Sequence, residues 1–376
     1  MSIWYNHVRV RIDLDALVAN YRRIRDIASN PAPVIKSDAY GHGIREAGMA
    51  LFAAGARTLA AGTVGEAVVL KECVPAAEVI SLLGPLDNAE YQAVAERDII
   101  PFVGSEEQLQ RLEEVGRASG APVRVALKFD TGMSRLGFSV DEAAGVASTL
   151  GGLEHVRASL VCSHLATADD PDQTDFTREQ GERFARVVRA LHGLGLDVRA
   201  SLANSGAILG HPSLHHDVQR PGIALYGCNP FHGMAWADKC PALEPCMEVT
   251  TRLLQVRTIQ AGRSVSYGRT FTADRDMRVG IVALGYADNY ARVSSNTGYL
   301  MVHGRRAPIL GRVCMQLTAV DLTAVPEAEV GDVVFVLGGD GPARITAEDL
   351  AEWWRTITYE VLCLLGQNPR VYGRVG

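Results

Sequence analysis

The feature that most constrains the fold of this chain is an alternation of short apolar runs with helical periodicity over its first two-thirds. A parallel sheet wrapped by helices requires this alternation, because each crossover between parallel strands needs a helix-sized connection. The predicted strands are Pro33–Ile35, Thr58–Ala61, Glu78–Leu83, Ile99–Val103, Val123–Phe129, Val156–Cys162, Val198–Leu202 and Gly222–Leu225. Eight strand-helix units over about 230 residues predict a closed (β/α)8 barrel, which typically takes ~250 residues. A doubly wound open sheet is the alternative.

The predicted helices carry their own start signals. Asp13 is the expected N-cap of the first helix, whose apolar residues recur every three or four positions. Ser105 and Gln108 form a capping-box pattern at the start of a helix expected over 105–118. A further helix is predicted over 180–194. Helices of this kind would cover the outside of the barrel.

The rhythm changes after Pro230. Short apolar or alternating runs separated by glycine-containing turns now predominate, which predicts a mainly β domain. The predicted strands of this domain are Met247–Thr251, Val279–Leu284, Tyr299–Val302, Ala319–Leu322 and Val333–Val336. One late helix is expected to open near Thr346. We therefore expect a barrel domain over residues 9–235 and a β domain over residues 236–376, with residues 1–8 joining the second domain.

Composition and charge exclude several classes of protein. The 376 residues include 37 Lys+Arg and 43 Asp+Glu, a formal net charge of −6, whereas nucleic-acid binders are usually basic. No stretch approaches the ~20 apolar residues of a membrane helix, and the first residues lack the apolar segment of a signal peptide. The seven cysteines are too scattered for a disulfide framework or a zinc site. We therefore expect a soluble, cytoplasmic protein with reduced thiols.

Barrel enzymes carry their reacting groups at the C-terminal ends of the strands, and several polar residues occupy such positions here. Lys36 directly follows the first predicted strand. A lysine stem surrounded by core side chains holds its ammonium less readily, so the amine becomes a nucleophile that can condense with an aldehyde. Taken alone, Lys36 is also compatible with a strand-end lysine whose ammonium extends into solvent.

Other strand ends suit a phosphorylated cofactor. Asn204 and Ser205 follow the seventh strand, and Gly222 with Ile223 opens the eighth, where barrels commonly bind a phosphate through backbone N–H groups. Arg220 lies next to them. A lysine, a phosphate cradle and an arginine together suit pyridoxal phosphate, whose ring nitrogen is met by an acidic residue or an arginine.

These residues lie within longer blocks that resemble the alanine racemase family of pyridoxal-phosphate enzymes. The blocks, in the family's order, are Val34–Gly43, Lys128–Phe138, Ser163–Ala168, Arg220–Gly227 and Val265–Gly268. The first is similar to the family's cofactor-attachment motif and is the most specific of them. The resemblance spans nearly the whole chain, and it implies a (β/α)8 barrel followed by a β domain.

The resemblance also implies a role for individual residues. Lys36 would attach the cofactor and act as one base, and Tyr267 of the partner subunit would act as the opposite base. The implied contacts of the cofactor phosphate are Tyr40, Asn204, Ser205, Gly222, Ile223 and Tyr359. His164 would stack on the ring and Arg220 would meet its nitrogen.

The remaining implied roles concern the substrate. Arg135 would meet the phenolic oxygen of the cofactor, and Met315 and Tyr286 would contact the substrate. Lys128 matches a lysine that is often carbamylated in the family, where the resulting anion orients that arginine. Gln316 departs from the family, which usually has an aspartate there, and this difference bears on the substrate entrance and range.

The function that the resemblance implies is interconversion of L- and D-alanine by a homodimer, supplying D-alanine for cell-wall peptidoglycan. Inverting a stereocentre requires proton removal on one face and return on the other, so two bases are the minimum. Alternatives are a racemase for serine, lysine or a broader range, a barrel decarboxylase using the same cofactor, and a noncatalytic cofactor-binding protein. No metal is expected. His211, His215 and His216 are predicted to lie in a loop, because Pro212 disrupts a helix there, and no nearby acid completes a site.

Overall fold

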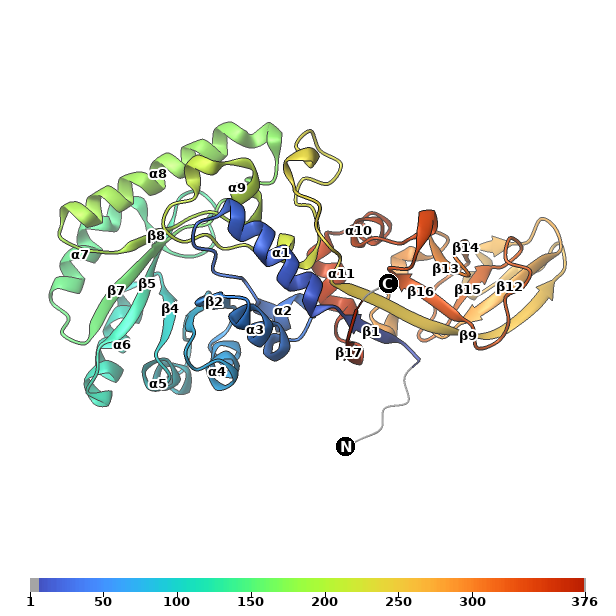
Figure 1. Cartoon of the computed structure of the whole chain (residues 1–376), viewed down its shortest axis with the longest axis horizontal. Helices are drawn as coiled ribbons and strands as arrows, with labels where there is room; N and C mark the ends of the chain where they lie inside the picture. The colour runs from blue at the N-terminus through green and yellow to red at the C-terminus, as the bar shows by residue number, and fades with distance from the viewer. Residues whose placement is uncertain (1–6, 375–376) are drawn as a thin grey trace. The chain divides into compact units, whose positions relative to one another are not determined.

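The computed structural model describes residues 7–374, which form two compact units (Figure 1). The first, here called the barrel unit, comprises residues 17–39 and 44–244. The second, here called the β unit, comprises residues 7–16, 40–43 and 245–374. Residues 1–6, which the sequence assigned to the β domain, lie outside the described residues. No helix within 7–374 is long and apolar enough to cross a membrane.

The barrel unit is built on a parallel sheet with helices outside it (Figure 1). Its strands pair in the order β2-β3-β4-β5-β7-β8, with the short β6 beside β5. Their bounds are β2 (Thr58–Ala61), β3 (Glu78–Ser81), β4 (Ile99–Val103), β5 (Val123–Asp130), β6 (Phe138–Ser139), β7 (Val156–Cys162) and β8 (Arg199–Ser201). Nearly every residue of β2, β3 and β4 is buried, as expected for strands covered on both faces.

Two extended segments close this sheet into a ring. Within residues 31–35, Ile35 N–H donates to the Ala60 carbonyl of β2 at 2.9 Å, and Val34 N–H donates to the Pro221 carbonyl at 2.8 Å. Residues 217–221 in turn pair with β8 through Val218 N–H. We call each of the eight extended segments around the barrel a stave, and residues 31–35 are the first. The prolines at 31 and 33 carry no N–H, so this stave forms too few backbone hydrogen bonds to be a regular strand. The predicted (β/α)8 barrel is confirmed.

The eighth predicted strand is wrong in position. Residues 217–221 form the eighth stave, whereas Ile223–Tyr226 is a 3₁₀-helix, η4. The chain leaves the extended region at Gly222, where φ is −124° and ψ is −93°. The error arose because residues 223–226 are all buried, and a short apolar run looks the same in a buried strand and a buried helical turn.

The helices of the barrel unit follow the predicted start signals. Asp13 Oδ1 accepts from Ala16 N–H, and Ser105 Oγ accepts from Gln108 N–H, so both predicted caps are confirmed. The helix expected to begin at residue 180 begins earlier, at Thr174. The bounds are α1 (Leu14–Ile27), α2 (Lys36–Tyr40), α3 (Ile44–Ala53), α4 (Val64–Cys73), α5 (Asn88–Glu96), α6 (Glu106–Ser119), α7 (Ala143–Gly151), α8 (Thr174–Gly193) and α9 (Ser205–Gly210).

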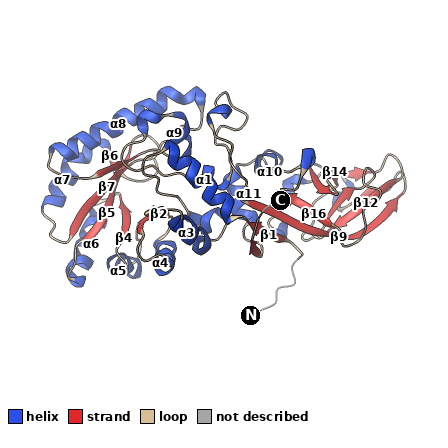
Figure 2. Ribbon diagram, viewed as in Figure 1, coloured by secondary structure: helices blue, strands red, loops and turns tan. Residues whose placement is uncertain are grey.

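The β unit is dominated by one mostly antiparallel sheet (Figure 2). Its strands pair in the order β12-β15-β14-β13-β16-β9-β1-β17, and a second pairing of β12 with β9 closes six of them into a ring. The bounds are β1 (Arg9–Ile12), β9 (Met247–Ile259), β12 (Met277–Val282), β13 (Tyr299–Val302), β14 (Arg305–Leu310), β15 (Thr318–Asp321), β16 (Val333–Leu337) and β17 (Arg370–Tyr372). A hairpin, β10 (Ser264–Val265) and β11 (Phe271–Thr272), and two helices, α10 (Ala347–Trp354) and α11 (Thr358–Leu365), complete it.

Strand β1 shows a difference from the expected domain boundary. The sequence analysis began the barrel domain at residue 9, whereas Arg9–Ile12 pairs antiparallel with β9 and parallel with β17 in the β unit. These partners lie more than two hundred residues away along the chain. A local pattern does not reveal pairings of that separation.

Candidate active site

Lys36 ends the first stave and opens a turn of unusual backbone conformation. The following four residues, Ser37, Asp38, Ala39 and Tyr40, all have φ between 53° and 55°. Left-handed residues other than glycine cost about 1–2 kcal/mol each and cluster at functional sites. The stem of Lys36 is held closely, because a Cβ added to Gly62 would lie 3.1 Å from the Lys36 Cβ. The position of this lysine therefore depends on a strained turn of the backbone.

The barrel unit gathers positive charge around His164. The pKa of His164 lies well below its usual value, first because the ring is buried and then because Arg220, Lys128, Arg135 and Lys36 surround it. The imidazole is therefore neutral near pH 7. A cluster of cations around a neutral ring is suited to an anionic ligand with an aromatic face.

Arg220 is buried and forms no ion pair with the residues of 7–374. Its side chain is 4% exposed; Nη1 donates to Ser201 Oγ, and Nη2 donates to the Ser163 carbonyl at 2.6 Å. Burial lowers the pKa of the guanidinium, yet an arginine of this kind stays charged near pH 7. Among residues 7–374 the Nε–H donates to no group, so this charged donor is open to a ligand.

Lys128 is the second buried cation. It is 8% exposed, and its Nζ donates to the Phe129 carbonyl at 2.9 Å. Burial, reinforced by Arg220, lowers the pKa of Lys128 to about 8. Lys128 also lines a cavity of about 350 Å³ with mixed polar and apolar walls, together with Leu82 and Gly104, which directly follow β3 and β4. A substantial fraction of this amine is therefore uncharged, and so nucleophilic, in mildly alkaline water.

Asp130 organises the loop that bears Arg135, a role that sequence reasoning missed. Its carboxylate accepts from Gly132 N–H at 2.8 Å, Met133 N–H at 2.9 Å and Arg135 N–H at 3.1 Å. Burial alone would raise the pKa of Asp130, but these backbone donors lower it on balance. The detectable signal was an aspartate at a strand end followed by Thr-Gly, a pattern typical of a side chain that caps its own loop.

Gln180 is a second residue that sequence reasoning missed. Its fully buried side chain on α8 accepts from Ala166 N–H at 2.9 Å and donates to the His164 carbonyl at 3.2 Å, so it brackets the peptide that carries the histidine. It also approaches Thr131 Oγ1 at 3.4 Å. A glutamine on the buried face of an amphipathic helix was the available signal, because a buried amide needs partners.

Four residues of the predicted phosphate cradle, Asn204, Ser205, Gly222 and Ile223, lie together in the barrel unit. Ser205 Oγ accepts from Gly222 N–H at 2.9 Å, and Asn204 Oδ1 caps α9 through Ala207 N–H. In the described part of the chain, the N–H groups of Ser205 and Ile223 donate to no group, although both residues are buried. Unpaired buried N–H groups are rare in native proteins, so these donors fit an anion such as a phosphate.

Two further predicted phosphate contacts belong to the β unit. Tyr40 and Tyr359 pack with ring centroids 5.8 Å apart. Burial raises the pKa of Tyr40, so its hydroxyl keeps its proton and can donate to an anion. Gly41 follows with φ of 81°, and a Cβ there would collide with the Leu362 carbonyl of α11. Only glycine lets the Tyr40 turn approach α11 so closely.

Tyr267 lies in a strained turn of the β unit. It is 72% exposed, and its neighbours Ser266 and Arg269 have φ of 66° and 50°. The Ser266 hydroxyl donates to the Arg312 carbonyl at 2.6 Å, which ties the turn to the segment that contains Met315. The backbone at Tyr267 is therefore held in place, while the residue itself is mostly exposed.

Met315 and Tyr286 are held together in the β unit. Tyr286 N–H donates to the Cys314 carbonyl at 3.0 Å, and Ala287 N–H donates to the Met315 carbonyl at 2.8 Å. A Cβ on Gly285 would lie 2.4 Å from that carbonyl oxygen, so a side chain there would separate the two loops. The Met315 N–H donates to no group within residues 7–374, and the residue is 58% exposed.

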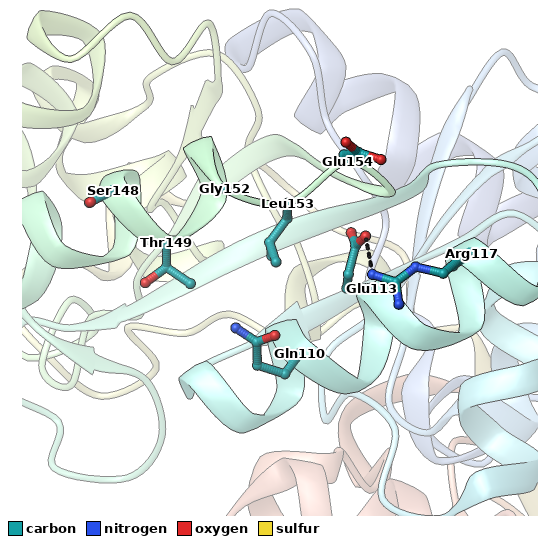
Figure 3. A pocket seen from close by; sticks show the side chains of 8 residues that line it. All are labelled: Gln110, Glu113, Arg117, Ser148, Thr149, Gly152, Leu153 and Glu154. Carbon is teal, nitrogen blue, oxygen red and sulfur yellow. Dashed lines mark hydrogen bonds and ion pairs between the residues drawn. The ribbon is translucent and has the colours of Figure 1, made fainter.

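The predicted site residues thus fall into two sets. The barrel unit holds Lys36, Lys128, Arg135, His164, Asn204, Ser205, Arg220, Gly222 and Ile223, and the β unit holds Tyr40, Tyr267, Tyr286, Met315 and Tyr359. A wide pocket of about 710 Å³ between α6 and α7 contains none of them; its buried Glu113 is paired with Arg117 (Figure 3). Within 7–374 no group of three His, Cys, Asp or Glu side chains could hold a metal ion.

Family models match both parts of the chain. The model described as alanine racemase, N-terminal domain, matches residues 12–230, and that described as alanine racemase, C-terminal domain, matches residues 246–372. The alanine racemase of Nitratidesulfovibrio vulgaris (strain DP4) is 53% identical over 370 residues, which cover 98% of each chain. This similarity agrees with the resemblance noted from the sequence blocks.

Solved structures are similar as well. The crystal structure of alanine racemase from D-cycloserine producing Streptomyces lavendulae matches with a TM-score of 0.91 at 32% identity, covering 99% of this chain and 98% of that one. The crystal structure of alanine racemase from Bartonella henselae with covalently bound pyridoxal phosphate matches with a TM-score of 0.87 at 30% identity, covering 98% and 99%. The fold of both units is therefore that of these enzymes.

Proposed function

Because the chain belongs to the alanine racemase family, we propose that it interconverts L- and D-alanine with pyridoxal phosphate as cofactor. One observation carries the assignment of the cofactor: the barrel unit surrounds a neutral His164 with four cations and leaves buried N–H groups at Ser205 and Ile223 without partners. Such a site suits a phosphorylated aromatic ligand. The product D-alanine would serve cell-wall peptidoglycan, and the enzyme would work in the cytoplasm.

The residues that would hold the cofactor divide by the part they meet. Lys36 would attach it, His164 would stack on the ring, and Arg220 would donate to the ring nitrogen. The residues that would contact the phosphate are Tyr40, Asn204, Ser205, Gly222, Ile223 and Tyr359. When bound, pyridoxal phosphate withdraws electrons from the α-carbon of an amino acid, which makes the α-proton removable. Arg220 would keep the ring nitrogen unprotonated and so moderate that withdrawal, because a guanidinium donates a proton to a hydrogen bond without giving it up.

Proton transfer would use two bases on opposite faces of the substrate. The Lys36 amine would take or return the proton on one face, and the phenol oxygen of Tyr267 of the partner subunit would do so on the other. The 72% exposure of Tyr267 on its own chain supports this, because most of the residue is left uncovered. The open Met315 N–H would bind the substrate carboxylate in the same shared site, beside Tyr286. The proposal therefore requires a homodimer.

Lys128 and Arg135 would orient the cofactor from the barrel side. The lowered pKa of Lys128, about 8, and its position on a cavity support carbamylation, in which the neutral amine adds to carbon dioxide and loses one proton. The carbamate would be an anion beside Arg135 and would hold that guanidinium toward the phenolic oxygen of the cofactor.

A direct experiment combines two measurements on the purified protein. We expect a visible absorption band that borohydride bleaches, with the reduced cofactor found on the peptide containing Lys36. We expect racemisation of alanine in a panel that also contains serine, lysine and arginine. Faster turnover of serine or lysine would reassign the substrate, release of carbon dioxide would favour a decarboxylase, and label on another lysine would refute the assigned site.

A further inference from the structure

The turn that follows Lys36 needs an external brace. Ser37, Asp38 and Ala39 lie in the left-handed region, each at a cost of about 1–2 kcal/mol, and none is a glycine. A run of this kind persists only where the surrounding structure over-determines it. The hydrogen bonds of the turn therefore show what holds the lysine in place.

The brace is the carboxylate of Glu66, in the first turn of α4. Its Oε1 accepts from Asp38 N–H at 3.0 Å, and its Oε2 accepts from Gly62 N–H at 2.9 Å and Thr63 N–H at 3.1 Å. One side chain thus joins the end of the first stave to the end of β2. The Asp38 carboxylate closes the other side of the turn by accepting from Ile44 N–H at 2.7 Å.

The packing at this point leaves no slack. A Cβ added to Gly62 would lie 2.8 Å from Glu66 Oε2 and 3.1 Å from the Lys36 Cβ, so the carboxylate and the lysine stem approach the same small gap. The missing side chain of Gly62 is what lets both reach it. Movement of the Glu66 carboxylate would therefore change the space available to the Lys36 stem.

A helix cap alone does not explain these contacts. Glu66 forms a capping box with Thr63, and that box uses only the Thr63 N–H. The chain has a similar box at Ser139 and Glu142. Within residues 7–374 the Glu142 carboxylate accepts from the Ser139 N–H and from no other group. The bonds of Glu66 to Asp38 and Gly62 are additional to capping, and they lead directly to the lysine.

We propose that Glu66 is a positioning residue for Lys36, holding the left-handed turn so that the lysine stem points at the cofactor and substrate. The inference rests on the proposed function, in which Lys36 is both attachment point and base. A tenfold change corresponds to about 1.4 kcal/mol, which the loss of one charged hydrogen bond is sufficient to produce. Loss of the Glu66 hydrogen bonds should therefore change kcat and the rate of cofactor loss, both of which depend on Lys36, by about tenfold or more.

The test compares Glu66→Gln with Glu142→Gln as a matched control, both in the full-length holoenzyme. In each variant the remaining amide oxygen can still accept the N-cap N–H, so the Tm should fall by no more than about 2 °C in either. The single amide oxygen of Glu66→Gln cannot also serve the Asp38 N–H. Only Glu66→Gln should accelerate hydrogen exchange at the Asp38 amide, by about tenfold or more. Only Glu66→Gln should lower kcat by about tenfold with KM nearly unchanged and speed the loss of pyridoxal phosphate on dialysis.

The possible outcomes separate the proposal from simple capping and from the proposed function. Equal kcat, cofactor retention and Asp38 exchange in the two variants would overturn the inference, leaving Glu66 as a helix cap. A fast-exchanging Asp38 amide in the wild-type protein would also overturn it, with no variant needed. If Lys36 carries no cofactor but Asp38 exchange still responds to Glu66→Gln, the brace stands and the assigned role of the lysine fails.

Discussion

The two sets of site residues include members that differ in how far their own unit buries them. In the barrel unit, Arg220 is 4% exposed and Lys128 is 8% exposed, and both donate to backbone carbonyls that fix their direction. In the β unit, Tyr267 is 72% exposed and Met315 is 58% exposed. The barrel unit therefore holds these candidate residues buried and fixed, whereas the β unit leaves Tyr267 and Met315 largely exposed.

The largest effect is expected for Lys36→Ala. The variant should lose the visible band of the bound cofactor and at least about 10⁴-fold in kcat, because one residue supplies both the attachment and a base. Absorption spectra and racemisation assays measure both. Lys71→Ala is the matched control, since Lys71 is a partly buried lysine that donates to the Ala77 carbonyl away from the site residues. A Lys36→Ala protein that keeps its band would show that another lysine holds the cofactor.

Tyr267→Phe should lower kcat by about 10²–10⁴-fold while the cofactor stays bound. Exchange of the α-proton in heavy water should become slow for one enantiomer and remain for the other, because only one face loses its base. Tyr299→Phe serves as a control on a tyrosine of the same unit that packs on Trp353. Equal, full-rate exchange from both enantiomers would remove Tyr267 from the reaction.

Mixing the two inactive variants tests directly whether the site is shared. In a dimer of one Lys36→Ala chain and one Tyr267→Phe chain, one site would combine Lys36 with Tyr267 of the partner subunit and regain both bases. Random reassortment should then restore roughly a quarter of wild-type activity. If both bases come from one chain, the mixture stays inactive, and the contrast between buried and exposed groups needs another explanation.

Lys128 should make stability depend on pH. Its pKa falls from 10.5 when exposed to about 8 in the fold, so between those values the unfolded chain binds more protons and the free energy of unfolding rises with pH. The total rise is about 3 kcal/mol, flat below pH 8 and again above pH 10.5. Denaturant unfolding in buffer free of carbon dioxide, compared with Lys128→Met, isolates this slope. No difference in slope would mean that Lys128 does not titrate as an amine.

The smallest effect is expected for Gln180→Glu. The glutamate can still accept from Ala166 N–H but loses the donor to the His164 carbonyl, which should cost about 1–3 kcal/mol of stability. Because the histidine belongs to the barrel set, the absorption maximum of the cofactor should shift as well. Gln110→Glu, on the exposed wall of the α6 pocket, is the control. A spectrum identical to wild type would limit Gln180 to a structural role.

Sequence reasoning found most elements and most polar candidates. The caps at Asp13 and Ser105 and the strands β9, β12, β13, β15 and β16 followed from local patterns, because capping and alternation depend on near neighbours. It misplaced the eighth stave and missed β1 and β17, which are short and pair across long separations. It also missed Glu66 and Gln180, whose partners include loop residues far from them in sequence. It missed Asp130 as well, which accepts from backbone N–H groups of its own loop.

The order of residues by itself determined that Lys36, Lys128, His164 and Ser205 lie at or near the ends of parallel strands, because period and strand-end position are local properties. Only the tertiary structure decided how each is held. The Glu66 carboxylate on α4 accepts from the turn after Lys36, and the Gln180 amide on α8 donates to the His164 carbonyl. The buried guanidinium of Arg220 keeps its Nε–H open to a ligand. Those contacts depend on which helix packs beside which strand end, and that follows from closing the barrel as a whole.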